Sequence, residues 1–392
     1  MTWTTIPTYK NLPLPCIEWS ANILPNDNFY LDLLEPFDNS NLTWKPKVKL
    51  PINTWASTAV ASLDNSTIFL IGGYMRNKTL DYDFSNQVYT YNDSTSKWTM
   101  PSITGDVIPS RQQIRGVINN SGNIYIFGGV EVDATYLTYL TDKKYKYNGN
   151  FSNDMNILNT SSMTWMNLRI YKNLPSSCSD YSANILPDGI IVYIGGQEIG
   201  GPLVKMKNIK LFDTNKSEWS QMNAIGGDDI DSRWLFTSVL TSNGFIIIFG
   251  GCSYYLTSVS PKLAILNTNK SPYEWTIPDS SKAPSIYGHS ANLYCNYMII
   301  TFGFDIDNKT YNSHQVYLYD ITNNTWVTRF NPPTTCNSTF PSPACGLTCK
   351  LLIGFGTGIS VVLICVGIFI VHKKRKRNDR YSRTKNSHIY KL

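Results

Sequence analysis

The chain has 392 residues, of which 42% are hydrophobic, 13% aromatic and 16% charged. This composition predicts a folded chain with one or two sizeable cores, and it excludes a disordered chain, which would be rich in charge and poor in aromatic residues. The net charge of +6 is concentrated in residues 372–392, which carry nine Lys or Arg and one Asp, so the rest is close to neutral and we expect no nucleic-acid-binding domain.

The N-terminal residues contain part of a repeat. Residues 20–25 are identical to residues 182–187, but the later copy continues into a glycine-ended strand, whereas the first continues into residues 29–33. About twenty residues of the repeat are missing there, and residues 1–30 show no signal peptide. We therefore expect the start of the chain to be incomplete or misjoined; the alternative is a degenerate first repeat that the fold tolerates.

Five short apolar segments end in glycine. Each predicts a strand buried on both faces, and the glycines predict a close approach of a neighbouring backbone. The first glycines are 56, 67, 55 and 53 residues apart, and Phe304 replaces the second glycine of the fifth pair. The glycines of the five segments are Gly72, Gly73, Gly128, Gly129, Gly195, Gly196, Gly250, Gly251 and Gly303.

An alternating strand, a polar turn and a Trp follow each segment. One such four-stranded unit cannot bury its own faces, so we expect the units to stack around an axis, with the Trp filling the wedge between adjacent sheets. An additional Trp closes the incomplete first unit. The six tryptophans are Trp44, Trp98, Trp165, Trp219, Trp275 and Trp326.

These residues resemble the kelch family of β-propellers. Residues 287–291, Tyr-Gly-His-Ser-Ala, are similar to the family's first strand, and Arg111 and Arg233 lie in comparable places. The resemblance covers about residues 16–330 and implies an all-β, six-bladed propeller with an incomplete first blade. The predicted blades are residues 16–48, 54–102, 112–170, 180–222, 233–278 and 286–330.

The resemblance includes copper-radical galactose oxidases, which share the fold. A copper site of that kind needs imidazoles and tyrosines converging on one face, and outside the C-terminal tail the chain has only His289 and His314. We therefore expect no catalytic residues, metal or cofactor, and a structural hydrogen-bonding role for His289. A carbohydrate oxidase is the least favoured alternative.

A binding module for a protein or glycan is favoured instead. The third repeat has a long insertion between its glycine pair and its Trp, and two tyrosines lie at the equivalent place in the fifth blade. Tyrosines suit binding because they combine apolar area with a polar tip. The candidate contact residues are Tyr136, Tyr139, Tyr145, Tyr147, Tyr254 and Tyr255.

The cysteines offer possible disulfides, and the glycosylation sequons favour a secretory route. Cys252 and Cys295 form one possible pair, and two of Cys336, Cys345 and Cys349 could bridge in the linker 331–350. Chance gives about seven Asn-x-Ser/Thr sequons in this composition, and the chain has more. The sequon asparagines are Asn41, Asn65, Asn77, Asn92, Asn119, Asn150, Asn159, Asn215, Asn269, Asn308, Asn323 and Asn337.

Residues 351–371 form an uncharged run that predicts one transmembrane helix, since 21 residues reach about 31 Å. The basic residues that follow predict a cytoplasmic tail over residues 372–392 and a propeller that is extracellular or lumenal. We thus expect a single-pass membrane glycoprotein. The alternative is a tail-anchored cytosolic kelch scaffold.

Overall fold

The computed structural model describes residues 28–47, 50–76, 87–131, 150–311 and 315–333, and the backbone of residues 352–354. The chain divides into two units, and residues 133–148 and 357–392, which make up the second, lie outside the described residues. All that follows concerns the first unit. Its described residues form β-strands and one 3-10 turn, η1 (Gly227–Asp229), and none forms an α-helix.

Five antiparallel sheets of four strands, here called blades 2 to 6, follow one another along the chain. Blade 2 contains β5 (Thr58–Ala61), β6 (Thr67–Ile71), β8 (Val88–Asn92) and β9 (Lys97–Thr99). Blade 3 contains β12 (Gly116–Ile118), β13 (Asn123–Phe127), β15 (Met155–Asn159) and β16 (Thr164–Asn167), with β10 (Thr104–Gly105) parallel to β16. Blade 4 contains β18 (Ser182–Ile185), β19 (Ile190–Ile194), β21 (Asn208–Asp213) and β22 (Glu218–Asn223). Blade 5 contains β23 (Thr237–Leu240), β24 (Phe245–Phe249), β25 (Leu263–Asn267) and β26 (Glu274–Thr276). Blade 6 contains β28 (Ser290–Tyr294), β29 (Tyr297–Thr301), β32 (Val316–Asp320) and β33 (Thr325–Val327).

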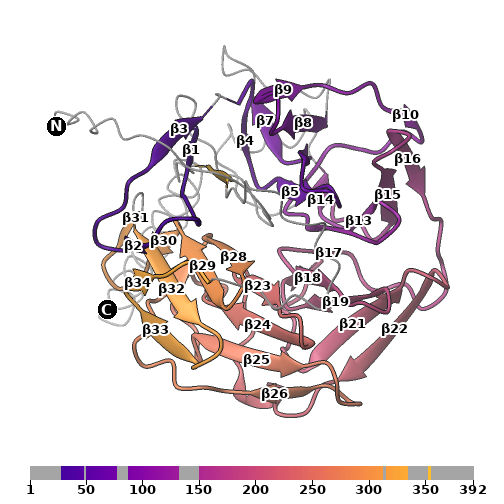
Figure 1. Ribbon diagram of the computed structural model, residues 1–392. Coiled ribbons are helices and arrows are strands. Elements are labelled where there is room, and N and C mark those ends of the chain that lie inside the picture. The colour runs from indigo at the N-terminus through magenta and orange to yellow at the C-terminus, as the bar shows by residue number, and fades with distance from the viewer. Residues whose placement is uncertain are drawn as a thin grey trace, which may run out of the picture. The chain divides into compact units, whose positions relative to one another are not determined.

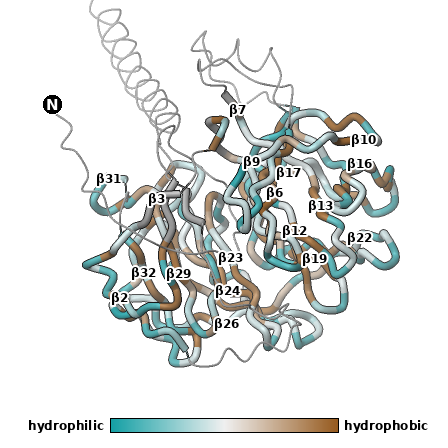
Figure 2. The backbone as a smooth tube through the Cα atoms, turned by 45° about the horizontal axis from the view of Figure 1, so that its top comes forward, coloured by the Kyte–Doolittle hydropathy of each residue, from teal (hydrophilic) through white to brown (hydrophobic). Residues whose placement is uncertain are grey.

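The blades stand side by side around a central axis (Figure 1). The first strand of each blade is innermost, because β5, β12, β18, β23 and β28 contact one another in this order. The second strand is buried on both faces, which explains its uninterrupted apolar sequence. Figure 2 shows the hydrophobic residues concentrated along the strands and the hydrophilic ones in the connecting turns. The all-β, propeller-like fold is therefore confirmed.

The hydrophobic core is divided into layers between neighbouring blades. One layer combines Val192 and Ile194 of blade 4 with Ile246 and Ile248 of blade 5. The tryptophans complete these layers, since the Trp219 ring of blade 4 lies 4.5 Å from the Phe127 ring of blade 3. Each such indole fills the space against the preceding blade.

The glycine pairs lie where one blade approaches the next. A Cβ on Gly128 would lie 2.5 Å from the carbonyl oxygen of Cys178 in blade 4, so only glycine fits. The second glycine then donates its N–H to that carbonyl, with 2.8 Å between the nitrogen of Gly129 and the oxygen of Cys178.

The predicted register of the fifth glycine pair is wrong. β29 ends at Thr301, and Phe302 and Gly303 follow with φ angles of 61° and 91°, the values of the first and second glycines elsewhere. Gly303 is thus the second residue of its pair, and Phe304 lies beyond it. Phe302 is tolerated because its ring packs on Trp44, at 6.0 Å between ring centroids.

The predicted first blade contains no four-stranded sheet in its described residues. β1 (Asn28–Tyr30) pairs with β3 (Lys45–Lys47) on one edge and with β35 (Leu352–Gly354) on the other. β2 (Phe37–Asp38) pairs instead with β34 (Arg329–Phe330), which follows blade 6. Residues near the N-terminus therefore cover the open face of blade 6.

The predicted membrane helix, residues 351–371, lies outside the described residues except for residues 352–354. Those three residues form the strand β35 instead of the start of a helix. Within the described ranges, no helix has both the length and the apolar character needed to cross a membrane. The tail, residues 372–392, and the linker from residue 334 to 350 are also outside these ranges.

Candidate functional site

The two ends of the propeller are built differently. At one end, tight turns join the first strand to the second and the third to the fourth; we call this the turn end. At the other, the loop end, the second strand connects to the third and each blade connects to the next. Short strands before the blades pair there with residues after the glycine pairs: β4 (Asn53–Trp55) with β7 (Tyr74–Arg76), β11 (Arg111–Gln112) with β14 (Val130–Glu131), β17 (Cys178–Ser179) with β20 (Gln197–Glu198), and β27 (Ile286–Tyr287) with β30 (Phe304–Asp305).

A ring of left-handed residues surrounds the axis at the loop end. Ala56, Gln113, Asp180, Leu235 and Gly288 occupy the same position in successive blades, with φ between 53° and 61°. The N–H of Gln113 donates to the carbonyl of Ala56 at 2.8 Å, and that of Asp180 donates to the carbonyl of Gln113 at 3.1 Å. Non-glycine residues in this conformation cost of order 1 kcal/mol each. The hydrogen bonds between blades offset that cost.

Asp180 is the titratable member of this ring. Burial raises its pKa to about 7, although the Ser179 hydroxyl at 3.0 Å and the charge of Arg115 oppose the shift. Asp180 therefore changes charge near neutral pH, beside a guanidinium that is only 3% exposed.

Histidine contributes no reactive group to the described loop end. His289 is buried, and its Nε2 lies 2.7 Å from the hydroxyl of Thr237 in blade 5. Burial lowers the pKa of His289 to about 3, so the ring is neutral and packs between two blades. His314 lies outside the described residues, and the described ranges hold no group of three or more His, Cys, Asp or Glu that could bind a metal.

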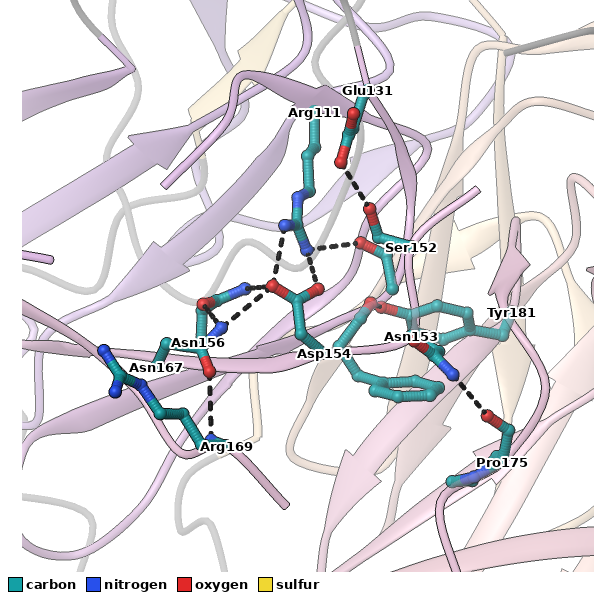
Figure 3. Close-up of polar contacts among 12 residues, drawn as sticks. Arg111, Glu131, Ser152, Asn153, Asp154, Asn156, Asn167, Arg169, Pro175 and Tyr181 are labelled. Carbon is teal, nitrogen blue, oxygen red and sulfur yellow. Dashed lines mark hydrogen bonds and ion pairs between the residues drawn. The ribbon is translucent and has the colours of Figure 1, made fainter. Parts of the chain in front are cut away.

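Arg111 and Arg233 bind backbone carbonyls. Arg111 donates to the carbonyl of Gly128 at 3.2 Å and forms an ion pair with Asp154 (Figure 3). Arg233 donates to the carbonyl of Gly250 at 3.1 Å. Burial disfavours the charge of Asp154, but its hydrogen bond and ion pair with Arg111 prevail and lower its pKa. Through these hydrogen bonds, each arginine holds the backbone at the first glycine of its own blade.

An aromatic surface, defined as Trp234, Tyr254 and Tyr255, lies at the loop end of blade 5. The Tyr254 ring stacks on Trp234 with 6.4 Å between centroids and 17° between planes, and Tyr255 stands perpendicular to Tyr254. The side chains of Tyr254 and Tyr255 are 53% and 81% exposed. Two large aromatic side chains thus face solvent in a fixed arrangement.

The turn that carries the two tyrosines is hydrogen-bonded internally. The Ser253 hydroxyl lies 2.6 Å from the Thr257 hydroxyl and accepts the N–H of Tyr255 at 3.2 Å. The indole N–H of Trp234 donates to the carbonyl of Ser253 at 3.0 Å. The turn is therefore anchored to the blade, and binding would cost little ordering of these side chains.

A second aromatic row lies at the loop end of blade 6. Tyr287, Phe304 and Tyr311 follow one another at centroid distances of 5.3 and 5.0 Å, and Tyr311 is exposed. The sequence did not identify Trp234 or this row as contact residues: Tyr287 and Phe304 were considered only as parts of the repeat pattern, and their proximity to the glycine pairs was the available signal. Tyr136, Tyr139, Tyr145 and Tyr147 lie outside the described residues.

The possible Cys252–Cys295 pair is not the one that forms. Cys252, like Cys178, is a buried thiol. Cys295 is disulfide-bonded, and its partner lies outside the described residues because the two other described cysteines are thiols. Cys336, Cys345 and Cys349 are also outside them.

Comparisons with known proteins agree with this geometry. The chain is 30% identical to Kelch domain-containing protein 3 of Bos taurus over 195 residues, which cover 48% of this chain and 45% of that protein. Kelch domain-containing protein 3 of Rattus norvegicus is 31% identical over 196 residues, again with 48% and 45% covered. The matched part thus spans less than half the length of these relatives.

A solved structure titled "Structure of YjhT" shares the fold. It superposes with a TM-score of 0.57 at 13% identity, covering 81% of this chain and 98% of that one. The family model described as Attractin/LZTR1 beta-propeller matches residues 68–342, from the second strand of blade 2 to beyond blade 6. Because this match covers most of the chain and includes all five glycine-ended segments, the chain belongs to the Attractin/LZTR1 beta-propeller family.

Proposed function

We propose that this propeller is a non-catalytic interaction module that binds a protein partner at its loop end, through the aromatic surface of blade 5. The observation that carries the proposal is the exposure of Tyr254 and Tyr255 on an internally hydrogen-bonded turn. Large aromatic side chains held in one conformation lose little entropy on binding and dominate the energetics of many interfaces.

The polar groups of the loop end support binding rather than catalysis. Arg111 and Arg233 are committed to backbone carbonyls, and Asp154 is committed to Arg111. His289 is neutral and inaccessible at 1% exposure. A catalytic site would need groups that can reach a substrate. A carbohydrate oxidase stays the alternative: elemental analysis of purified protein finding stoichiometric copper would favour it.

The neighbouring aromatic row extends the proposed surface. Tyr311 is exposed at the loop end of blade 6, next to blade 5 in the ring. A partner that covers both blades would bury aromatic side chains from each. If enzymatic removal of glycans from the partner abolished binding, the assignment would change from a protein to a glycan ligand.

The proposal includes membrane anchoring by residues 351–371, on the strength of their uncharged sequence and the basic residues that follow. A helix over this whole run would replace the pairing of residues 352–354 with β1. Protease treatment of intact cells and of sealed microsomes separates the two topologies. An extracellular propeller is degraded when protease is added to intact cells, and a lumenal one is protected in sealed microsomes. A tail-anchored cytosolic scaffold is protected in intact cells and degraded in microsomes.

Site-specific photo-cross-linking tests the proposed surface. A photoreactive phenylalanine analogue replaces Tyr255 in one sample and Tyr171 in another, because these residues are 81% and 82% exposed but lie in different loops. Tyr255 lies between β24 and β25 of blade 5, and Tyr171 lies between blades 3 and 4. We expect a discrete cross-linked partner from position 255 and none from position 171. Equal products from both positions would refute the assignment.

A further inference from the structure

Every described four-stranded blade carries one glycosylation sequon between its third and fourth strands. These turns lie at the turn end, immediately before the Trp of each blade. The five asparagines are Asn92, Asn159, Asn215, Asn269 and Asn323. The sequon therefore recurs once in the same turn of each of the five blades.

The geometry of the turn does not require these sequons. The last residue of the third strand accepts a backbone N–H from the turn, and this role is filled by Asn92 Oδ1 in blade 2 and by Asp213 Oδ1 in blade 4. Asn and Asp serve equally in such turns. In blade 4 the sequon begins two residues later, at Asn215, and in blade 6 it begins three residues after Asp320. The position of the sequon varies, but its presence does not.

The sequon asparagines are accessible at the turn end. Asn215, Asn269 and Asn323 are exposed, and Asn92 and Asn159 are partly exposed. Asn65 and Asn119, in the turns between the first and second strands of blades 2 and 3, lie at the same end, because the two kinds of turn are joined by hydrogen bonds such as Asp93 N–H to Ser66 carbonyl, 2.9 Å.

The loop end carries fewer sequons in its described part. They begin at Asn150 and Asn308, against seven at the turn end. Of the other three sequons, Asn41 lies in the N-terminal segment after β2, and Asn77 and Asn337 lie outside the described residues. The aromatic surface at Tyr254 and Tyr255 has no sequon in its turn.

Cys295 gives an independent indication of the compartment. It lies in the turn between β28 and β29 at the turn end, and it is disulfide-bonded. Structural disulfides persist in oxidising compartments, which are those where asparagine glycosylation takes place.

We propose that the turn end is an N-glycosylated face with one glycan on each of the five blades. The transfer uses an oligosaccharide on a lipid diphosphate: a bond forms between asparagine Nδ2 and sugar C1, the bond between C1 and the diphosphate oxygen breaks, and one amide proton is lost. The remaining amide N–H of Asn215 can still donate to the carbonyl of Asp188, now at 2.8 Å. This inference does not depend on the proposed partner surface.

Site-resolved mass spectrometry tests this face. The full chain is purified from cells that produce it and treated with peptide N-glycosidase in heavy-oxygen water, which marks each formerly glycosylated asparagine as labelled aspartate. We expect label at the turn-end sequons, in at least four of the five blades. Absence of label from all five, or label confined to Asn150 and Asn308, would overturn the proposal.

A matched pair of variants controls for folding. Ser94→Ala removes the sequon but leaves Asn92 and its turn bond to the Thr95 N–H in place, whereas Ser94→Thr keeps the sequon. Ser94 is exposed, so both variants should fold. On a denaturing gel, we expect the Ser94→Ala variant to migrate faster than the wild type by the mass of one glycan. We expect the Ser94→Thr variant to migrate like the wild type. Identical mobility of both variants and the wild type would count against glycosylation at Asn92.

Discussion

At the scale of single residues, a backbone carbonyl of the neighbouring blade restricts which residue can occupy the first position of each glycine pair. The first glycine of a pair combines positive φ with a backbone oxygen that lies where a Cβ would need space, as at Gly128 and Gly250. At the equivalent position of blade 6, Phe302 faces Trp44 of the N-terminal segment. The requirement for glycine thus comes from the next blade and not from the turn itself.

Gly128→Ala tests this explanation against Gly200→Ala. Both glycines have φ near 60°, but a Cβ at residue 128 meets a carbonyl at 2.5 Å, whereas one at residue 200 meets nothing within 4 Å. We expect a loss of about 1 kcal/mol for Gly200→Ala from backbone strain and of about 2–4 kcal/mol for Gly128→Ala. Urea denaturation measures both, and equal losses would contradict the carbonyl explanation.

Asp180 makes the stability of the propeller depend on pH. The folded carboxyl has a pKa of about 7 because of burial, and the unfolded one titrates near 4. Between these values the folded state binds more protons, so the free energy of unfolding falls as the pH rises from about 4 to 7.

Asp180→Asn should remove that dependence. Asn also tolerates the φ of 54° at this position. Because Asp180 is partly exposed, we expect the variant to gain about 1–2 kcal/mol over the wild type at pH 8 and nothing comparable at pH 4. Denaturation at the two pH values measures the difference, and a gain of the same size at both would show that Asp180 does not titrate in this range.

At the scale of strands and sheets, the tryptophans contribute to the hydrophobic layers that join neighbouring blades. Trp219 is 2% exposed and touches Phe127 of the preceding blade as well as Tyr193 and Phe212 of its own. Trp98 of blade 2 is only partly buried. The tryptophans therefore occupy equivalent positions but differ in how much they stabilise the ring.

Trp219→Ala should cost about 3–5 kcal/mol, since it empties the space between blades 3 and 4. Trp98→Ala should cost clearly less, because part of its ring is already in water. Denaturant midpoints of the two purified variants give the comparison. A larger loss at residue 98 than at residue 219 would contradict the assigned packing.

The strands could be predicted from sequence more readily than the site. Uninterrupted apolar segments identify the second strands because they are buried on both faces. The register of Phe302–Gly303 could not be predicted, because a single glycine fits the sequence pattern as either the first or the second residue of the pair. Only the backbone φ angles show which of the two positions Gly303 occupies. The axial ring was also not predictable, because Ala56, Gln113, Asp180, Leu235 and Gly288 share a conformation but no residue type.

At the scale of the whole propeller, the two ends have different chemistry. The turn end has short polar turns with sequons, and the loop end has the axial ring and exposed aromatic side chains. Part of the candidate site was visible in the sequence, since Tyr254 and Tyr255 follow a glycine pair directly. Trp234, which supports them, is distant in sequence, and the pairing of β23 with β24 brings it opposite Cys252, next to the two tyrosines.

Equilibrium affinity for the cross-linked partner, measured with purified proteins, is the most direct test of the loop end as a binding surface. The account predicts that the double variant Tyr254→Ala, Tyr255→Ala weakens binding at least about 30-fold, the effect of losing one strong interface contact. The matched variant Tyr171→Ala should bind like the wild type. Unchanged affinity in the double variant, or an equal loss in Tyr171→Ala, would contradict the account.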